Sequence, residues 1–593
     1  MPGWPVRVFI SLAGSAYHAT PRSVYHINSC QRKSVMPAVV PRVAATTQPP
    51  AKRSTVDQAP TNEPHRPPAQ QRARQPTPQG RGRGTKGTRA TRRRTGRGGS
   101  THRGPVLTRR ERGSPLKRPR SWDTAPEGKD SPGRRAARLF HPRFTRGNVH
   151  IRLVAVDEGD LKALLREHAG RHSVPGAAIG VLRDGTITTA CYGVADIATG
   201  EQVTPETRFS AGSLTKSMVA TVIARLADEG RIALDDRVAA HVPEVSGSEW
   251  ARGATLRDLL ANRSGLPLRE ALEFGFDDHR DEDDGALARL ASAVGACEPT
   301  PNVWSYTNVG WCLLGRATET VTSAPWEEAM RRHVLEPAGM DGTTFATSAK
   351  IEGRASGHEV TAHGPVPVEP LVSRAYGPAG TSAISTVVDL LRLAAVHIRD
   401  PSLAALREKH ADVSIHGWFD AWCLGWASFH WSDGPVWGWD GLINGERSVL
   451  RLMPDRRTAV VVMTNSGTGR AMVRSLIPEL MDSLFGIGVP PLRLETSVGA
   501  AGDLSRFAGV YGWPDRRVEV TATADRLAIS EANRESDALP VDECTFLVDP
   551  ADPDNPTVTF GAFDAAGRPG VLYVMLWGLP RLGDQGDRPI ASL

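Results

Sequence analysis

The stretch that decides the fold is "FSAGSLTKSMVATVIARL", Phe209 to Leu226. It places Ser213 and Lys216 three residues apart, directly before an apolar pattern with helical spacing that Gly230 ends. Because residues i and i+3 share one face of a helix, the Lys216 amine can reach the Ser213 hydroxyl. The stretch therefore predicts either a nucleophile with its base or a polar helix N-cap, and taken alone it does not decide between them.

The chemistry of such a pair depends on an uncharged lysine. A serine alkoxide needs a base, and the neutral amine of Lys216 has a lone pair that can accept the Ser213 proton. Keeping a lysine neutral at pH 7 requires its pKa to fall by about three units, or roughly 4 kcal/mol. Burial and nearby hydrogen-bonding groups can supply this shift, and a helix N-terminus favours the developing anion. A second S-x-x-K, Ser114 to Lys117, precedes no helical pattern, and we interpret it as chance.

Two further motifs accompany the pair. "WSYTNVGWCLLG" contains Tyr306 and Asn308 before an apolar helical run. Tyr306 is predicted to relay the proton, and Asn308 to orient the lysine and a substrate amide; the alternative is a loop tyrosine followed by an Asn cap. "WGWDGLINGERSVLRLMPDRRTAVVVMTNS" carries the triplet Trp-Asp-Gly at 439–441, where a strand begins.

In this order, the three motifs resemble those of the serine β-lactamase and penicillin-binding superfamily. They are most similar to the branch of class C β-lactamases, D-alanyl-D-alanine carboxypeptidases and family VIII esterases, which carries S-x-x-K, Y-x-N and a third H-x-G, K-T-G or W-x-G triplet. The resemblance covers about residues 160–485, and the sequence after 503 is similar to the lipocalin-like β module often attached to this branch. Intervening stretches match as well: "VPGAAIGVLRDG", "ATLRDLLANRSGLP" and "GPAGTSAISTVVDLLRL".

The resemblance implies acyl transfer without a metal or another cofactor. Ser213 would attack a carbonyl to form an acyl-enzyme that water then hydrolyses, with Lys216 and Tyr306 sharing the base and acid work. The implied oxyanion hole is the N–H of Ser213 and the N–H of Leu442, each such donor being worth about 3–4 kcal/mol of barrier. The third triplet is implied to contribute to substrate binding: Trp439, Asp440 and Gly441.

The third triplet also departs from the cationic or imidazole form of the motif. Trp439 carries no charge, and offers one N–H and a flat apolar wall. This argues against a strong preference for carboxylate-bearing β-lactams or peptide C-termini and favours esters or small amides, as in the esterases of this branch with a tryptophan here. The region just upstream is aromatic, and its tryptophans predict either an apolar acyl pocket or core filling beside a sheet: Trp418, Trp422, Trp426, Trp431 and Trp437.

The predicted fold class is α+β, a β-lactamase/transpeptidase-like fold with an antiparallel sheet flanked by helices and a helical subdomain. We expect a disordered Arg/Gly/Pro-rich tail over 1–145 and a hydrolase domain over 155–486. A linker over 487–502 and a small β-barrel domain over 503–593 follow. Hairpins are predicted at Asp184-Gly185 and at Pro454-Asp455, and a helix near 470–485.

Charge is divided unevenly along the chain. Residues 1–150 hold 31 Lys+Arg against 6 Asp+Glu, so the remainder, with 72 − 31 = 41 basic and 65 − 6 = 59 acidic residues, is acidic. The overall charge of +7 is therefore no argument for nucleic-acid binding by the whole chain. For residues 1–145, a solvated tail or upstream sequence translated from too early a start is favoured over a nucleic-acid-binding arm.

Other features of the sequence limit which cofactor, cellular location and partner are expected. The six cysteines have no metal-ligand or disulfide spacing, and the acidic run 277–284 lacks the pattern of a calcium loop. No apolar run predicts a membrane span, and the N-terminal stretch is a poor signal peptide, which favours a cytoplasmic protein. The expected partner is a small ester, amide or β-lactam-like molecule.

Three functions follow, in order of preference. The first is a serine hydrolase acting on an ester or amide. The second is a true β-lactamase or D-alanyl-D-alanine carboxypeptidase, for which export would be expected. The third is a non-catalytic ligand-binding protein whose basic arm binds nucleic acid.

Overall fold

A computed structural model describes the chain over 156–266, 285–295, 303–346, 351–497, 499–513, 516–532, 534–552 and 556–583. The predicted tail over 1–145, the acidic run 277–284, Cys30 and Cys297 lie outside these residues.

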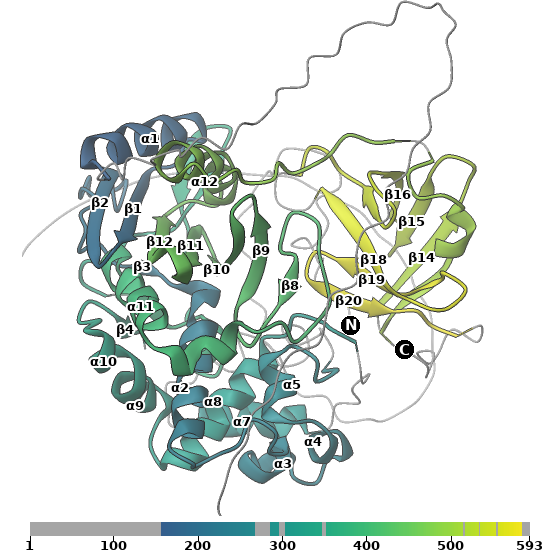
Figure 1. Cartoon of the computed structure of the whole chain (residues 1–593), viewed down its shortest axis with the longest axis horizontal. Coiled ribbons are helices and arrows are strands. Elements are labelled where there is room, and N and C mark those ends of the chain that lie inside the picture. The colour runs from purple at the N-terminus through teal and green to yellow at the C-terminus, as the bar shows by residue number, and fades with distance from the viewer. Residues whose placement is uncertain are drawn as a thin grey trace, which may run out of the picture. The chain divides into compact units, whose positions relative to one another are not determined.

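A seven-stranded antiparallel sheet forms the centre of the larger domain (Figure 1), in the order β2-β1-β12-β11-β10-β9-β8. The first hairpin turns at Asp184 and Gly185, both of which have positive φ, as a two-residue turn between twisted strands requires. The second, between β11 and β12, turns at Pro454, so both predicted hairpins are confirmed. The strands are β1 (Gly176–Arg183), β2 (Thr186–Gly193), β8 (Ala421–Trp422), β9 (Ala427–Trp431), β10 (Gly434–Ile443), β11 (Glu446–Met453) and β12 (Thr458–Thr464).

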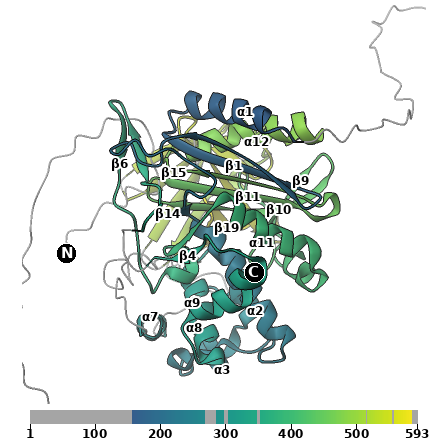
Figure 2. The same cartoon turned by 90° about the vertical axis from the view of Figure 1, so that its left-hand side faces the viewer.

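Helices cover both faces of this sheet, as Figure 2 shows. On one face α1 (Glu158–Arg171) packs against α12 (Gly469–Phe485), the helix predicted near 470–485. On the other face α11 (Val387–Arg399) packs against β1 and β12. The central strands are buried on both sides, which explains their nearly continuous apolar sequences.

A helical layer completes the domain. At its centre lies α2 (Thr215–Asp228), the helix that follows Ser213; its buried residues include even its polar first turn, and it packs against α8. The other helices of this layer are α3 (Val238–His241), α4 (Glu249–Gly253), α5 (Leu256–Leu260), α7 (Ala286–Val294), α8 (Val309–Thr322), α9 (Trp326–Met330) and α10 (Glu336–Ala338).

Two small sheets, which the sequence did not predict, lie beside the large sheet: β3 contacts β11, and the His358 nitrogen of β5 donates to the carbonyls of Gly445 and Asn465. One has the order β3-β7-β4, and the other is the hairpin β5-β6. Their strands are β3 (Phe209–Ser210), β4 (Thr344–Phe345), β5 (His358–Thr361), β6 (Gly364–Pro367) and β7 (Ala383–Ser385).

The C-terminal part is an antiparallel eight-stranded sheet that curls into a barrel, as predicted. An antiparallel bridge between Tyr511 and Arg581 brings the last strand to the first and nearly closes it. Its interior is filled by side chains that include Phe507, Phe546 and Phe560. The strands are β13 (Gly509–Trp513), β14 (Arg516–Ala522), β15 (Leu527–Glu531), β16 (Arg534–Pro540), β17 (Thr545–Leu547), β18 (Thr557–Phe563), β19 (Pro569–Val574) and β20 (Trp577–Pro580).

The predicted fold class is confirmed by this arrangement of a helix-flanked antiparallel sheet, a helical layer and a small barrel. Within the described part of the chain, no helix has both the length and the apolar character needed to cross a membrane. The same residues contain no group of three or more His, Cys, Asp or Glu side chains placed to hold a metal ion.

Candidate active site

Ser213 lies in a single 3-10 turn, Gly212–Leu214, between β3 and α2. The N-cap of α2 is Leu214, so the alternative of a simple serine N-cap is wrong. Gly212 has φ of 51°, and a Cβ there would lie 2.8 Å from the Leu442 nitrogen. The turn therefore requires glycine twice, for its left-handed backbone and for its close approach to β10. This approach puts the turn that carries Ser213 next to Leu442, so the two predicted oxyanion donors lie on neighbouring segments.

Lys216 points from the first turn of α2 toward Ser213 and is completely buried. Its Nζ lies 3.0 Å from Ser213 Oγ, 2.9 Å from Asn308 Oδ1 and 2.5 Å from the carbonyl oxygen of Ala379. These oxygens are uncharged and come from three segments distant in sequence, so the amine is held in one position. Sequence reasoning predicted the contacts with Ser213 and Asn308 but missed Ala379, although the stretch "GPAG" at 377–380 was among those carrying the resemblance.

The segment that contains Ala379 also approaches Ser213. It is a 3-10 turn, Gly377–Ala379, followed by Gly380 with φ of 127°. A Cβ at Gly380 would lie 2.3 Å from the Gly212 oxygen and 2.9 Å from the Ser213 nitrogen. Only glycine lets the two backbones approach this closely.

Tyr306 lies beside the same amine, on the segment that precedes α8. Lys216 Nζ is 4.9 Å from the centre of the Tyr306 ring, and the Trp439 Nε1–H donates to Tyr306 Oη over 3.0 Å. Trp439, in β10, is only 2 % exposed. The Trp439 indole N–H therefore donates to Tyr306, and not to a substrate as the sequence suggested.

Asp440 and Gly441, the other members of the third triplet, and Leu442 after them lie in three different environments. Asp440 forms an ion pair of 2.6 Å with Arg451 of β11, so its carboxylate is already matched by a cation. A Cβ at Gly441 would lie 2.2 Å from the Ala211 oxygen, which shows how closely β10 passes the turn that carries Ser213. Leu442, directly after it, is 48 % exposed, an unusual value for a large apolar side chain in this domain.

A buried ion pair supports the strand that leads to Ser213. Glu446 Oε1 accepts the backbone N–H of Ser210 at 2.9 Å, and Glu446 Oε2 lies 3.0 Å from Arg354. Burial raises the pKa of the Glu446 carboxyl, in opposition to the charge of Arg354. Next to it, Ser448 Oγ donates to the Ala211 carbonyl over 2.7 Å. Sequence reasoning missed this support, because Ser210 and Glu446 lie 236 residues apart along the chain.

Two of the five tryptophans upstream of the triplet lie fully in the core. Trp422 and Trp426 are completely buried, and the Trp422 indole donates to the Leu260 carbonyl over 3.1 Å. Trp437 is partly buried and donates to the Arg407 carbonyl over 2.8 Å. Trp418 and Trp431 are partly buried against the two core clusters. The core interpretation therefore holds for Trp422 and Trp426.

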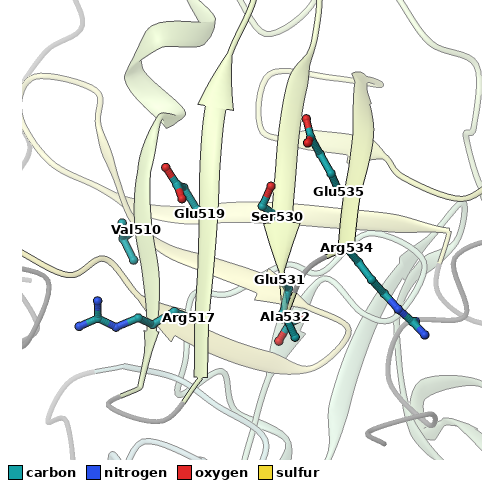
Figure 3. Close-up of a pocket in the computed structure, with 8 residues that line it drawn as sticks. All are labelled: Val510, Arg517, Glu519, Ser530, Glu531, Ala532, Arg534 and Glu535. Atoms are coloured by element: carbon teal, nitrogen blue, oxygen red, sulfur yellow. The ribbon is translucent and has the colours of Figure 1, made fainter.

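A pocket in the barrel lies apart from these residues (Figure 3). It is a polar surface on β13–β16 that contains none of the predicted site residues. Its lining is Val510, Arg517, Glu519, Ser530, Glu531, Ala532, Arg534 and Glu535.

Known proteins share this fold and are similar to this chain in sequence. The family model described as "Beta-lactamase" matches residues 161–481. Penicillin-binding protein 4 of Amycolatopsis lactamdurans is 31 % identical over 363 residues, which cover 57 % of this chain and 93 % of that protein. The crystal structure of SurE superposes with a TM-score of 0.61 at 26 % identity, covering 72 % of this chain and 99 % of SurE. A complex of SurE with D-Leu superposes similarly, with a TM-score of 0.60.

The chain belongs to the β-lactamase family, within the serine β-lactamase and penicillin-binding protein superfamily. It is a hydrolase of that family by relationship, which confirms the resemblance that the three motifs indicated.

Proposed function

We propose that the chain is a serine hydrolase that cleaves an ester or amide through an acyl-enzyme on Ser213. The observation that carries the proposal is the 3.0 Å contact between Lys216 Nζ and Ser213 Oγ, with the same amine held by Asn308 and Ala379. A nucleophile within hydrogen-bond reach of a base that other groups orient is the arrangement covalent catalysis needs.

In the proposed first step the Ser213 Oγ–H proton passes to the uncharged Lys216 amine as the Oγ–carbon bond forms. The carbonyl oxygen becomes an oxyanion, which the N–H groups of Ser213 and Leu442 stabilise. The bond to the leaving group then breaks, and the alcohol or amine departs with a proton delivered through Tyr306. The product of this step is an acyl ester on Ser213.

In the second step a water molecule attacks the acyl ester and gives its proton to the same base. The carboxylic acid leaves, and the proton returns to Ser213 Oγ. Support for Tyr306 as the proton relay comes from its neighbours, because the Trp439 N–H stabilises negative charge on Oη and Lys216 Nζ lies over the ring.

The proposed substrate has an uncharged group next to the reacting carbonyl. Trp439 replaces a cationic or imidazole residue and is buried against Tyr306, so it offers no charge for a substrate carboxylate. An ester or a small amide is the class that such a site fits.

Hydrolysis of p-nitrophenyl butyrate tests this proposal. Ser213→Ala should abolish turnover, whereas Ser114→Ala, which removes the serine of the other S-x-x-K, should keep the parental rate. A fluorophosphonate should label the parent on Ser213, as mapped by peptide mass spectrometry. Equal turnover by Ser213→Ala and the parent would rule the function out.

A second candidate, an amidase for D-amino acid residues, is favoured by the SurE complex with D-Leu. Here the carbonyl attacked by Ser213 would belong to a D-configured residue. The two p-nitroanilides of D- and L-leucine separate the candidates: a D preference of tenfold or more in kcat/KM supports the amidase, and equal or L-preferring rates reject it.

The true β-lactamase alternative has its own test, suggested by the relative named as a penicillin-binding protein. Fluorescent penicillin would label Ser213 in that case, and hydrolysis of nitrocefin would distinguish turnover from a stable acyl-enzyme.

A further inference from the structure

The barrel contacts the hydrolase domain at the segment that bears Tyr306. The turn between β19 and β20, residues 575–576, places the Leu576 carbonyl 3.0 Å from the Tyr306 backbone nitrogen, which donates to it. The Gly578 nitrogen donates to Ser305 Oγ over 3.3 Å. The proposed proton relay is thus attached through its own main chain to the C-terminal barrel.

Close packing accompanies these hydrogen bonds. A Cβ at Gly578 would lie 2.3 Å from the Trp304 carbonyl oxygen and 3.0 Å from a Val303 methyl group. Strand β20 can therefore lie this close to the segment 303–306 only because residue 578 has no side chain. The Tyr573 ring meets the Trp304 ring edge-on, with 6.1 Å between their centres.

The contact belongs to one continuous core. Val571, Tyr573 and Leu576 of the barrel are each at most 7 % exposed and cluster with buried residues of the hydrolase domain, Tyr306 and Trp304 among them. The remaining barrel core, around Phe560, forms a separate cluster. The hairpin therefore contributes its apolar side chains to the support of the active site, while the barrel keeps its own interior.

The opposite side of the same segment is held by the hydrolase domain. Ser305 N–H donates to the Asn262 carbonyl over 3.0 Å, so the segment 303–306 is fixed between the end of the α5 region and the barrel turn. A proton relay must be held to within about 0.5 Å to act efficiently. Displacement of the hairpin would move Tyr306 relative to Lys216 and Trp439.

We propose that the hairpin β19–β20 is a positioning element for Tyr306, so that the barrel supports the chemical step itself. This inference rests on the proposed function, because it assigns Tyr306 a part in proton transfer. Leu576 and Gly578 act here only through Tyr306 and do not touch substrate.

The experiment compares full-length variants on p-nitrophenyl butyrate. Gly578→Ala adds a Cβ against the Trp304 carbonyl and should lower kcat at least tenfold with KM within twofold of the parent. Phe560→Leu is the control: Phe560, in β18, belongs to the barrel's own core cluster and not to the cluster that contains Tyr306. This variant should keep kcat and KM within twofold while lowering the melting temperature. The pH profile of kcat/KM should shift for Gly578→Ala and stay unchanged for Phe560→Leu.

Each outcome decides the matter. Equal kcat values for Gly578→Ala and Phe560→Leu would overturn the inference, and so would a rise in KM at constant kcat, which would make the hairpin a substrate contact. If Gly578→Ala does not melt cooperatively, Leu576→Ala is measured instead, because it removes atoms and cannot introduce a clash. The same changes in kcat, KM and pH profile are then expected of Leu576→Ala. Failure of the proposed function shows separately, as equal turnover by Ser213→Ala and the parent.

Discussion

The hydrogen bond between Trp439 and Tyr306 predicts a measurable catalytic defect in Trp439→Phe. Phenylalanine keeps most of the ring but removes the Nε1–H that donates to Tyr306 Oη over 3.0 Å. Trp439 is buried, so water is poorly placed to supply a replacement donor. The variant therefore leaves the tyrosine oxygen without this donor.

The size of the defect reports the charge on Tyr306 during the reaction. A hydrogen bond to a neutral oxygen contributes about 1 kcal/mol, and one to a charged oxygen about 1.5–3 kcal/mol. Since about 1.4 kcal/mol corresponds to tenfold in rate, the neutral case predicts a loss of about fivefold in kcat and the anionic case a loss of roughly 10- to 150-fold. We expect the larger loss, because a relay that passes a proton carries partial negative charge.

The assay is steady-state hydrolysis of p-nitrophenyl butyrate, with Trp437→Phe as the matched control. Trp437 lies two residues earlier in β10, and its indole N–H donates to the Arg407 carbonyl over 2.8 Å instead of to the tyrosine. The control should keep kcat within about threefold, since the hydrogen bond and the packing that it alters do not involve Tyr306. The reasoning is refuted if the two variants have the same kcat.

Three further changes test other parts of the structure. Gly380→Ala places a Cβ 2.9 Å from the Ser213 nitrogen and should slow fluorophosphonate labelling at least tenfold; labelling at the parental rate would contradict this. Glu446→Gln leaves Arg354 without its buried partner charge and should cost about 3 kcal/mol of unfolding free energy in urea. A loss under about 1 kcal/mol would show that the pair contributes little. Burial raises the pKa of Glu319 to about 7 from an ordinary 4.5, so the folded state binds this proton more tightly than the unfolded chain. The contribution of Glu319 to stability is thus complete below about pH 4.5 and is lost as the pH rises through 7, by up to about 3 kcal/mol. Glu319→Gln should therefore flatten the fall in melting temperature between pH 5 and 8. An unchanged slope would exclude Glu319 as the source of that fall.

Short-range patterns in the sequence predicted much of the fold and the central pair of the site. The spacing of Ser213 and Lys216 already places them on one helix face, and the two turn residues at Asp184 and Gly185 already favour a hairpin. Alternating and continuous apolar runs likewise predicted the barrel and the central strands. Such features depend on residues within one or two turns of the chain, where local geometry leaves few choices.

Only the tertiary structure decided which distant groups complete the site. Trp439 meets Tyr306 across 133 residues, Lys216 meets the Ala379 carbonyl across 163, and Glu446 meets Ser210 across 236. No local spacing encodes such contacts, because they arise from how strands and helices pack. Several of them use backbone atoms, which carry no side-chain signature in a sequence. The sequence determined the chemistry that the chain carries, and the packing of sheet, helices and barrel determined how that chemistry is held.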